Sequence, residues 1–141
     1  MNARHDNIRD MEYRLLQVCT DVETEPHLQI VDNKLPYKKS ANTDDDARLD
    51  IRARGFWRPG QNAFFDVRVT NADSKSQRNS KLETVLRKHE EEKKTQYNKR
   101  VMEIEHGSFT PLVFTASGVM SHECTKFHKA LAEKLSIKKY A

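Results

Sequence analysis

The segment RLDIRARGFWRPGQNAFFDVRV, residues 48–69, constrains the fold more than any other part of the chain. Apolar residues alternate with polar ones in two arms, a period that is typical of β-strands with one buried face. The alternating apolar positions are Leu49, Ile51 and Ala53 in the first arm and Phe65, Val67 and Val69 in the second. Gly55, Pro59 and Gly60 supply turn-forming residues between the arms. The segment is therefore predicted to form a β-hairpin.

An aspartate interrupts each arm of this hairpin. If the hairpin is centred near Arg58, Asp50 lies opposite Asp66, and both lie on the face away from the alternating apolar residues. Directly opposed positions have Cβ atoms about 5 Å apart, and like charges in such positions destabilise a sheet. Something must therefore compensate the repulsion between the two carboxylates.

Two kinds of compensation are open at this point. Arg48, Arg52 and Arg68 are close enough along the arms to pair with the aspartates. Alternatively, a divalent cation lies between the carboxylates, since Mg²⁺ prefers oxygen ligands and is often held by one or two carboxylates.

The remaining patterns predict the elements around the hairpin. We expect helices over residues 3–20, from about residue 81, and after Ser121, where the last carries an apolar stripe of Cys124, Phe127, Leu131 and Leu135. We expect strands at His27–Val31 and Phe109–Ala116, while Lys99–His106 fits either a helix or a strand. The order helix, three strands, helix, strand, helix predicts an α/β fold with a mixed sheet flanked by helices.

Composition sets broad limits on the class of protein. The chain has 141 residues, which suits a single domain over 1–141, and a net charge of +4 is compatible with an anionic partner. The sequence has no run of about 18 apolar residues, so no membrane span is predicted, and no signal peptide is recognisable. The two cysteines, Cys19 and Cys124, are expected to be buried free thiols of an intracellular protein.

The order of elements and the two acids resemble the restriction-endonuclease-like nucleases, whose signature is written PD-(D/E)XK. In this chain RLD would supply the first acid and DVR the second acid with its basic residue. Six segments are similar to the C-terminal domains of reverse-transcriptase polyproteins from invertebrate non-LTR retrotransposons: RHDNIRD, ARLDIRARGFW, AFFDVRV, KHEEEKKTQY, EHGSFTPLVF and FHKALAEKL. The resemblance implies an αβββαβ core and hydrolysis of DNA phosphodiesters.

The resemblance also implies a site. Asp50 and Asp66 would hold Mg²⁺ or Mn²⁺ with the main-chain carbonyl of Val67, and Asp6 of the first helix would complete the ligands. Arg68 stands where the signature has lysine; because arginine is not deprotonated in proteins, it can clamp a phosphate but cannot act as a base.

The missing lysine would come from the second helix, as Lys93 or Lys94. We assign the catalytic role to Lys94 and a DNA contact to Lys93. Further expected DNA contacts are Arg52, Arg54, Trp57 and Arg58 along the hairpin. The alternative for Trp57 is a hydrophobic lid on the turn.

These observations leave several functions open. The first is a metal-dependent DNA endonuclease that nicks or cuts target DNA, with a nuclear location expected from the family. A variant is a homodimer acting on branched DNA, as in archaeal Holliday-junction resolvases. The second is an inactive DNA-binding module of the same fold, and the third, a protein-interaction domain, leaves the aspartate pair unexplained.

Overall fold

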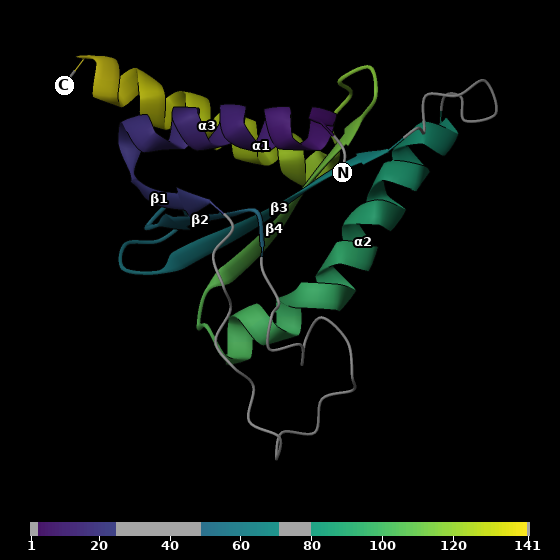
Figure 1. Ribbon diagram of the computed structural model, residues 1–141, viewed down its shortest axis with the longest axis horizontal. Coiled ribbons are helices and arrows are strands. Elements are labelled where there is room, and N and C mark those ends of the chain that lie inside the picture. Colours follow the sequence, from purple (N-terminus) through teal and green to yellow (C-terminus); the bar gives the residue numbers. More distant parts are fainter. Residues whose placement is uncertain (1–2, 25–48, 71–79, 141) are drawn as a thin grey trace.

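The computed structural model describes residues 3–24, 49–70 and 80–140. These residues form three helices and four strands (Figure 1). In chain order the elements are α1 (Ala3–Cys19), β1 (Asp21–Thr24), β2 (Ile51–Arg54), β3 (Asn62–Thr70), α2 (Ser80–Glu103), β4 (Ser108–Thr115) and α3 (His122–Tyr140).

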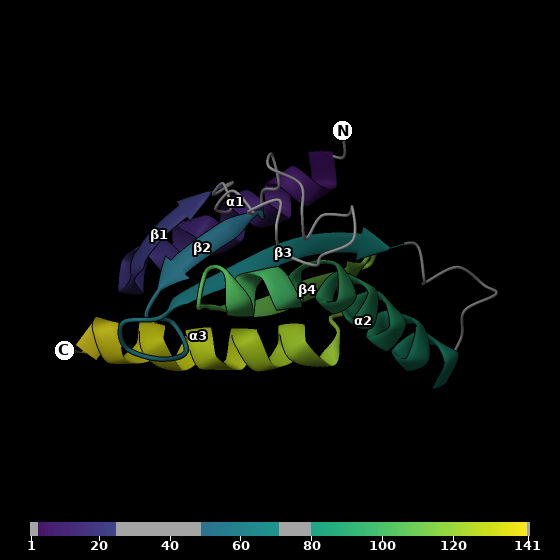
Figure 2. The same ribbon diagram turned by 90° about the horizontal axis from the view of Figure 1, so that it is seen from below.

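The strands form one mixed sheet in the order β1-β2-β3-β4. The β1–β2 and β2–β3 pairs are antiparallel, and β3 and β4 run parallel, joined by the crossover through α2. Helices α1 and α3 lie side by side on one face of the sheet and α2 lies on the other, as the two perpendicular views show (Figures 1 and 2). The α/β class and the mixed sheet expected from the sequence are confirmed.

The hairpin register is confirmed as well. Ile51 pairs with Phe65 and Arg54 pairs with Asn62, which is the alignment that places the centre of the hairpin at Arg58. The turn is closed by hydrogen bonds from the Gly55 N–H to the Gln61 carbonyl, at 2.7 Å, and from the Gln61 N–H to the Arg58 carbonyl. Gly55 and Gly60 have φ angles of 75° and 77°, which other residues rarely adopt.

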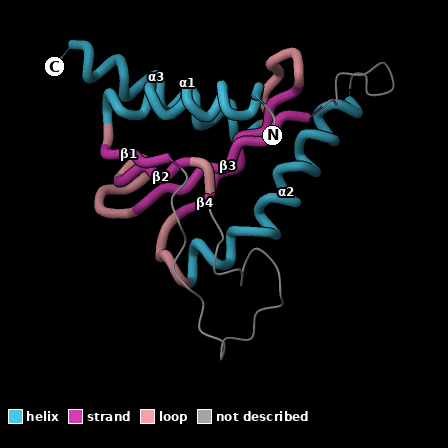
Figure 3. Tube along the Cα trace, viewed as in Figure 1, coloured by secondary structure: helices cyan, strands magenta, loops and turns pink. Residues whose placement is uncertain are grey.

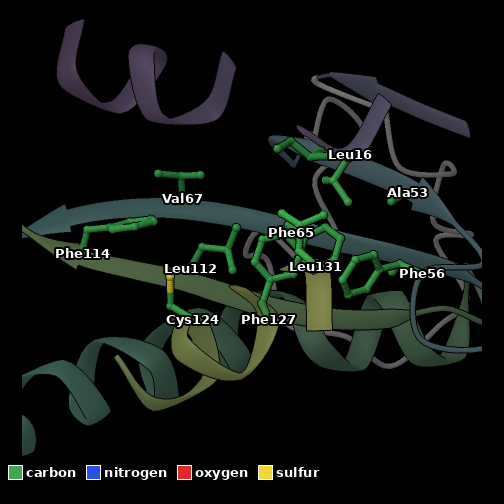
Figure 4. Close-up of a cluster of buried hydrophobic side chains, with 12 residues drawn as sticks. Leu16, Ala53, Phe56, Phe65, Val67, Leu112, Phe114, Cys124, Phe127 and Leu131 are labelled. Atoms are coloured by element: carbon green, nitrogen blue, oxygen red, sulfur yellow. The ribbon is translucent and has the colours of Figure 1, made fainter. Parts of the chain in front are cut away.

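The main core lies between the sheet and the α1–α3 layer. Phe65 of β3 contacts Phe127 of α3 at a ring-centroid distance of 4.7 Å, and Phe56 packs edge-on against Phe65 (Figure 4). The apolar stripe expected on α3 is confirmed, with Cys124, Phe127 and Leu131 buried. Ser121 caps this helix, since its Oγ accepts a hydrogen bond from the Cys124 N–H.

A second core lies on the opposite face, under α2. It contains Leu49, Phe64, Val101 and Phe109. The expectation that the face bearing Asp66 lies away from the apolar residues was therefore wrong in part, because Phe64 on that same face is 2 % exposed. The strand is covered by helices on both faces, so both of its sides are buried.

The strand expected at His27–Val31 lies outside the described residues. The strand that pairs with β2 is instead β1, directly after the first helix (Figure 3). The ambiguous segment after Lys99 continues α2 as far as Glu103.

The apolar residues of α1 are not all buried. Met11 and Val18 are exposed, whereas Glu12 is fully buried. The Glu12 carboxylate lies 2.6 Å from His128 Nε2 of α3, so a polar pair joins these two helices. Among the described residues, no helix is long and apolar enough to cross a membrane.

Candidate active site

The two aspartates of the hairpin meet in the folded chain. Asp66 lies within β3, and Asp50 lies one residue before β2; both residues are buried. Their carboxyl groups lie close enough for Asp50 to raise the pKa of Asp66, through its charge and as a hydrogen-bond partner. The prediction that the two acids lie together, rather than on opposite faces of the sheet, is therefore confirmed.

Asp50 accepts a hydrogen bond from β3 where β2 no longer pairs with that strand. The β2 strand pairs with β3 over Asn62–Phe65, whereas β4 accompanies β3 from Ala63 to Thr70. Beyond Phe65, the Val67 N–H donates to Asp50 Oδ2 at 2.6 Å. The N–H and C=O of one strand residue point to the same side of the strand, so the Val67 carbonyl also faces this side. The hairpin thus positions two carboxylates and a main-chain carbonyl at one edge of β3.

Two basic side chains from opposite helical layers approach this pair. Lys93 of α2 places its Nζ 2.6 Å from Asp66 Oδ2, and its side chain is 18 % exposed. His5 of α1 places Nε2 3.1 Å from Asp50 Oδ2, while its Nδ1 lies 3.1 Å from Asp6 Oδ1. The compensation expected from arginines is therefore made, among the described residues, by a lysine and a histidine.

The close approach of Asp50 changes the protonation of Asp66. Burial, followed by the hydrogen bond to Asp50 and the charge of Asp50, raises the pKa of Asp66 to about 7, against the opposing effect of Lys93. Burial disfavours the charged form of His5, but the charge of Asp50 and the hydrogen bonds to Asp6 and Asp50 outweigh it and raise the pKa of His5. A nearby cation such as the Lys93 ammonium lowers the pKa of Asp66, whereas burial and Asp50 favour its protonated form.

The contacts of Lys93 and Lys94 do not match the roles predicted for them. Lys93, assigned to DNA, contacts Asp66, whereas Lys94, assigned to catalysis, pairs with Glu123 at the start of α3. Arg68 lies on β3 two residues after Asp66, and its Nη1 is 3.2 Å from Glu92 Oε2 of α2. Of the two neighbouring lysines, Lys93 is thus the one that the fold brings to the carboxylates.

The hairpin residues assigned to DNA lie toward the turn. Arg54 pairs with Asn62, four residues before Asp66 and so about 13 Å away along the strand at 3.3 Å per residue. Arg54 and Arg58 are exposed, whereas Arg52 contacts Glu23 at 3.4 Å.

Trp57 follows the interpretation of a lid on the turn more closely than that of a free stacking platform. Its Nε1–H donates to Thr110 Oγ1 at 3.2 Å, and its ring packs edge-on against Phe56. The ring is half-buried, so only part of it is available to a base.

His5 is the site residue that the sequence reasoning missed. It stands between Asp6 and Asp50, so Asp6 reaches the pair through the imidazole. The adjacent letters H and D in RHDNIRD were the available signal, but their distance from the hairpin in the sequence gave no reason to connect them.

The donor set fits a hard divalent cation in part. Within the described ranges, no cluster of three or more His, Cys, Asp or Glu side chains has the arrangement of a metal site. The pair therefore offers two carboxylates, with the Val67 carbonyl beside them, and leaves other positions to water or substrate oxygens. Mg²⁺ is often held this way, by one or two carboxylates plus phosphate oxygens and water.

A separate groove lies elsewhere on the surface. It has a volume of about 740 Å³ and lies between α2 and the start of α3, lined by charged residues that include Lys94 and Glu123. The carboxylate pair is not part of that lining.

Comparison with known proteins gives no family assignment. Neither a scan against protein-family models nor a search of curated proteins finds a match to this chain.

Proposed function

We propose that this chain is a divalent-metal-dependent DNA endonuclease of the restriction-endonuclease-like type. The observation that carries the proposal is the buried contact between Asp50 and Asp66, with the Lys93 ammonium on the second carboxylate. Two adjacent acids can hold a divalent metal ion, and a lysine beside them can neutralise charge on a phosphate, as metal-assisted phosphodiester hydrolysis needs.

Each residue has a separate role in this proposal. Asp50 and Asp66 would hold Mg²⁺ or Mn²⁺ beside the Val67 carbonyl; when bound, such an ion supplies Lewis-acid activation of the phosphodiester. Asp50 is held in place by the Val67 N–H, and His5 orients it further. These fixed contacts keep the two carboxylates together without the substrate.

The basic residues would act on the phosphate. Lys93 would neutralise charge that develops on the phosphate oxygens and orient the attacking water. Arg68, on the same face of β3, would bind a phosphate after exchanging its contact with Glu92. The exposed Arg54 and Arg58 would contact the DNA backbone farther along the hairpin.

The resemblance to retrotransposon polyproteins suggests the substrate. A target-DNA nicking domain acts on duplex DNA, whereas a homodimeric resolvase acts on a four-way junction. Both need the same pair of acids, so the substrate preference distinguishes them.

A second candidate is a DNA-binding module that has lost catalysis. It is favoured by one observation: Arg68 occupies the position of the signature lysine and is engaged with Glu92. Such a module would bind DNA with a strong salt dependence and without regard to the aspartates.

The test is a cleavage assay on supercoiled plasmid and on a four-way junction, in Mg²⁺, in Mn²⁺ and in EDTA. The variants are Asp50→Asn and Asp66→Asn, with Asp10→Asn as the control, because Asp10 is half exposed and pairs with Arg9. We expect metal-dependent cutting that is lost in the first two variants and kept in the control. Binding without cutting in every variant would instead identify the inactive module.

A further inference from the structure

Lys93 and Asp66 form a largely buried lysine–carboxylate pair at the candidate site. The Nζ–Oδ2 distance is 2.6 Å, and the Asp66 side chain is 8 % exposed. The Lys93 ammonium also lies 5.7 Å from the centroid of the Tyr97 ring, one turn farther along α2. Lys93 therefore contacts the Asp66 carboxylate and lies near the Tyr97 ring.

We propose that Lys93 is a built-in counter-cation that gates metal entry: it occupies Asp66 in the metal-free protein and leaves Asp66 when a divalent cation binds. This inference rests on the proposed function, since it concerns metal loading of the same carboxylate pair. It adds an order of events, in which Lys93 becomes free for the phosphate only after the metal has entered.

The geometry supports competition between the two cations. Asp66 Oδ2 accepts from Lys93, while Asp50 Oδ2 is already used by the Val67 N–H and His5. An ion held by the two carboxylates would share Asp66 with the ammonium. Repulsion between cations that share a carboxylate is strong where water is largely excluded, so both cannot keep full contact with Asp66.

The surroundings allow Lys93 to move without unfolding. A lysine has a flexible four-carbon stem, and its charge needs no fixed bidentate partner. The Tyr97 ring offers the displaced ammonium a cation–π contact on the same helix. After this short movement, the ammonium remains beside the site where a phosphate would lie.

The experiment measures the binding of Mn²⁺ alone, by the electron paramagnetic resonance signal of free Mn²⁺, at about pH 8, above the range in which Asp66 is protonated. The variants are Lys93→Met, which removes the charge, and Lys93→Arg, which keeps it. Lys94→Met is the matched control, because the neighbouring lysine pairs with Glu123 and not with the carboxylates. Circular dichroism melts confirm that each variant is folded.

We expect Lys93→Met to bind Mn²⁺ about tenfold more tightly than the wild type, which corresponds to about 1.4 kcal/mol. Lys93→Arg and Lys94→Met should bind as the wild type does. If the wild type binds Mn²⁺ through Asp66 and Lys93→Met binds it equally or more weakly, the gate is refuted while the proposed function stands. If Asp66→Asn does not change Mn²⁺ binding in any background, the metal site itself is refuted, and the gate with it.

Discussion

Replacing Asp66 by asparagine should change the pH dependence of stability in a defined direction. Asp66 has a pKa of about 7 in the folded chain, against 3.8 as the ordinary value, mainly because it is buried and lies against Asp50. Between these two values the folded protein holds a proton that the unfolded chain has released. Stability from this group is therefore fully present below about pH 4 and is lost as the pH rises toward 7.

The size of the effect follows from the same values. One pH unit across this window corresponds to 1.36 kcal/mol, so the loss from pH 4 to pH 7 is at most about 4 kcal/mol. Asparagine has no proton to lose and keeps the shape of the side chain. The difference in unfolding free energy between Asp66→Asn and the wild type should therefore shift in favour of the variant by up to this amount across the window.

The assay is urea unfolding in EDTA at several pH values, followed by circular dichroism. Comparing the change in the difference, and not its absolute value, removes any constant cost from the lost contact with Lys93. Asp10→Asn provides the control, because Asp10 is half exposed and lies against Arg9. A difference that stays constant from pH 4 to pH 7 would refute the reasoning and would mean that Lys93 fully compensates an ionised Asp66.

Other consequences can be measured with the same protein. At about pH 8, Mg²⁺ should raise the unfolding free energy of the wild type, by about 2.7 kcal/mol at a hundredfold excess over Kd, and leave Asp66→Asn unchanged in urea melts. Glu90→Ala should lower the unfolding free energy by about 1 kcal/mol in thermal melts, because Glu90 Oε2 accepts the N–H of Glu123, the second residue of α3, at 2.8 Å. The control Glu91→Ala changes an exposed residue and should cost little, so equal losses would contradict this capping role. Gly107→Ala should cost about 1–3 kcal/mol in urea midpoints, since a Cβ there would lie 2.5 Å from the Asn62 carbonyl oxygen, and an unchanged midpoint would show that the backbone relaxes.

The hairpin shows what local sequence can predict. Alternation and three turn residues fix which residues face each other, and this information lies within one short segment. The pairing of Ile51 with Phe65 and the meeting of the two aspartates followed from it.

Other features depend on how separate elements dock. The β1 strand, Asp21–Thr24, has no alternating burial and is defined by its pairing with β2. Lys93 and Lys94 differ by one helical position, and only the docking of α2 decides which of them contacts Asp66. Similarly, Glu12 is polar in sequence but buried in the fold, because its partner His128 comes from the other end of the chain.

The three-layer construction of the site has a consequence for its dynamics. Asp50 and Asp66 come from the sheet, whereas their contacts His5 and Lys93 come from helices on opposite faces. Partial opening of either helix would change the charge around the carboxylates before the sheet itself unfolds. The hydrogen-exchange rates of the α1 and α2 amides should therefore change when Mn²⁺ binds. The affinity for Mn²⁺ then depends on how stably each helix packs on the sheet.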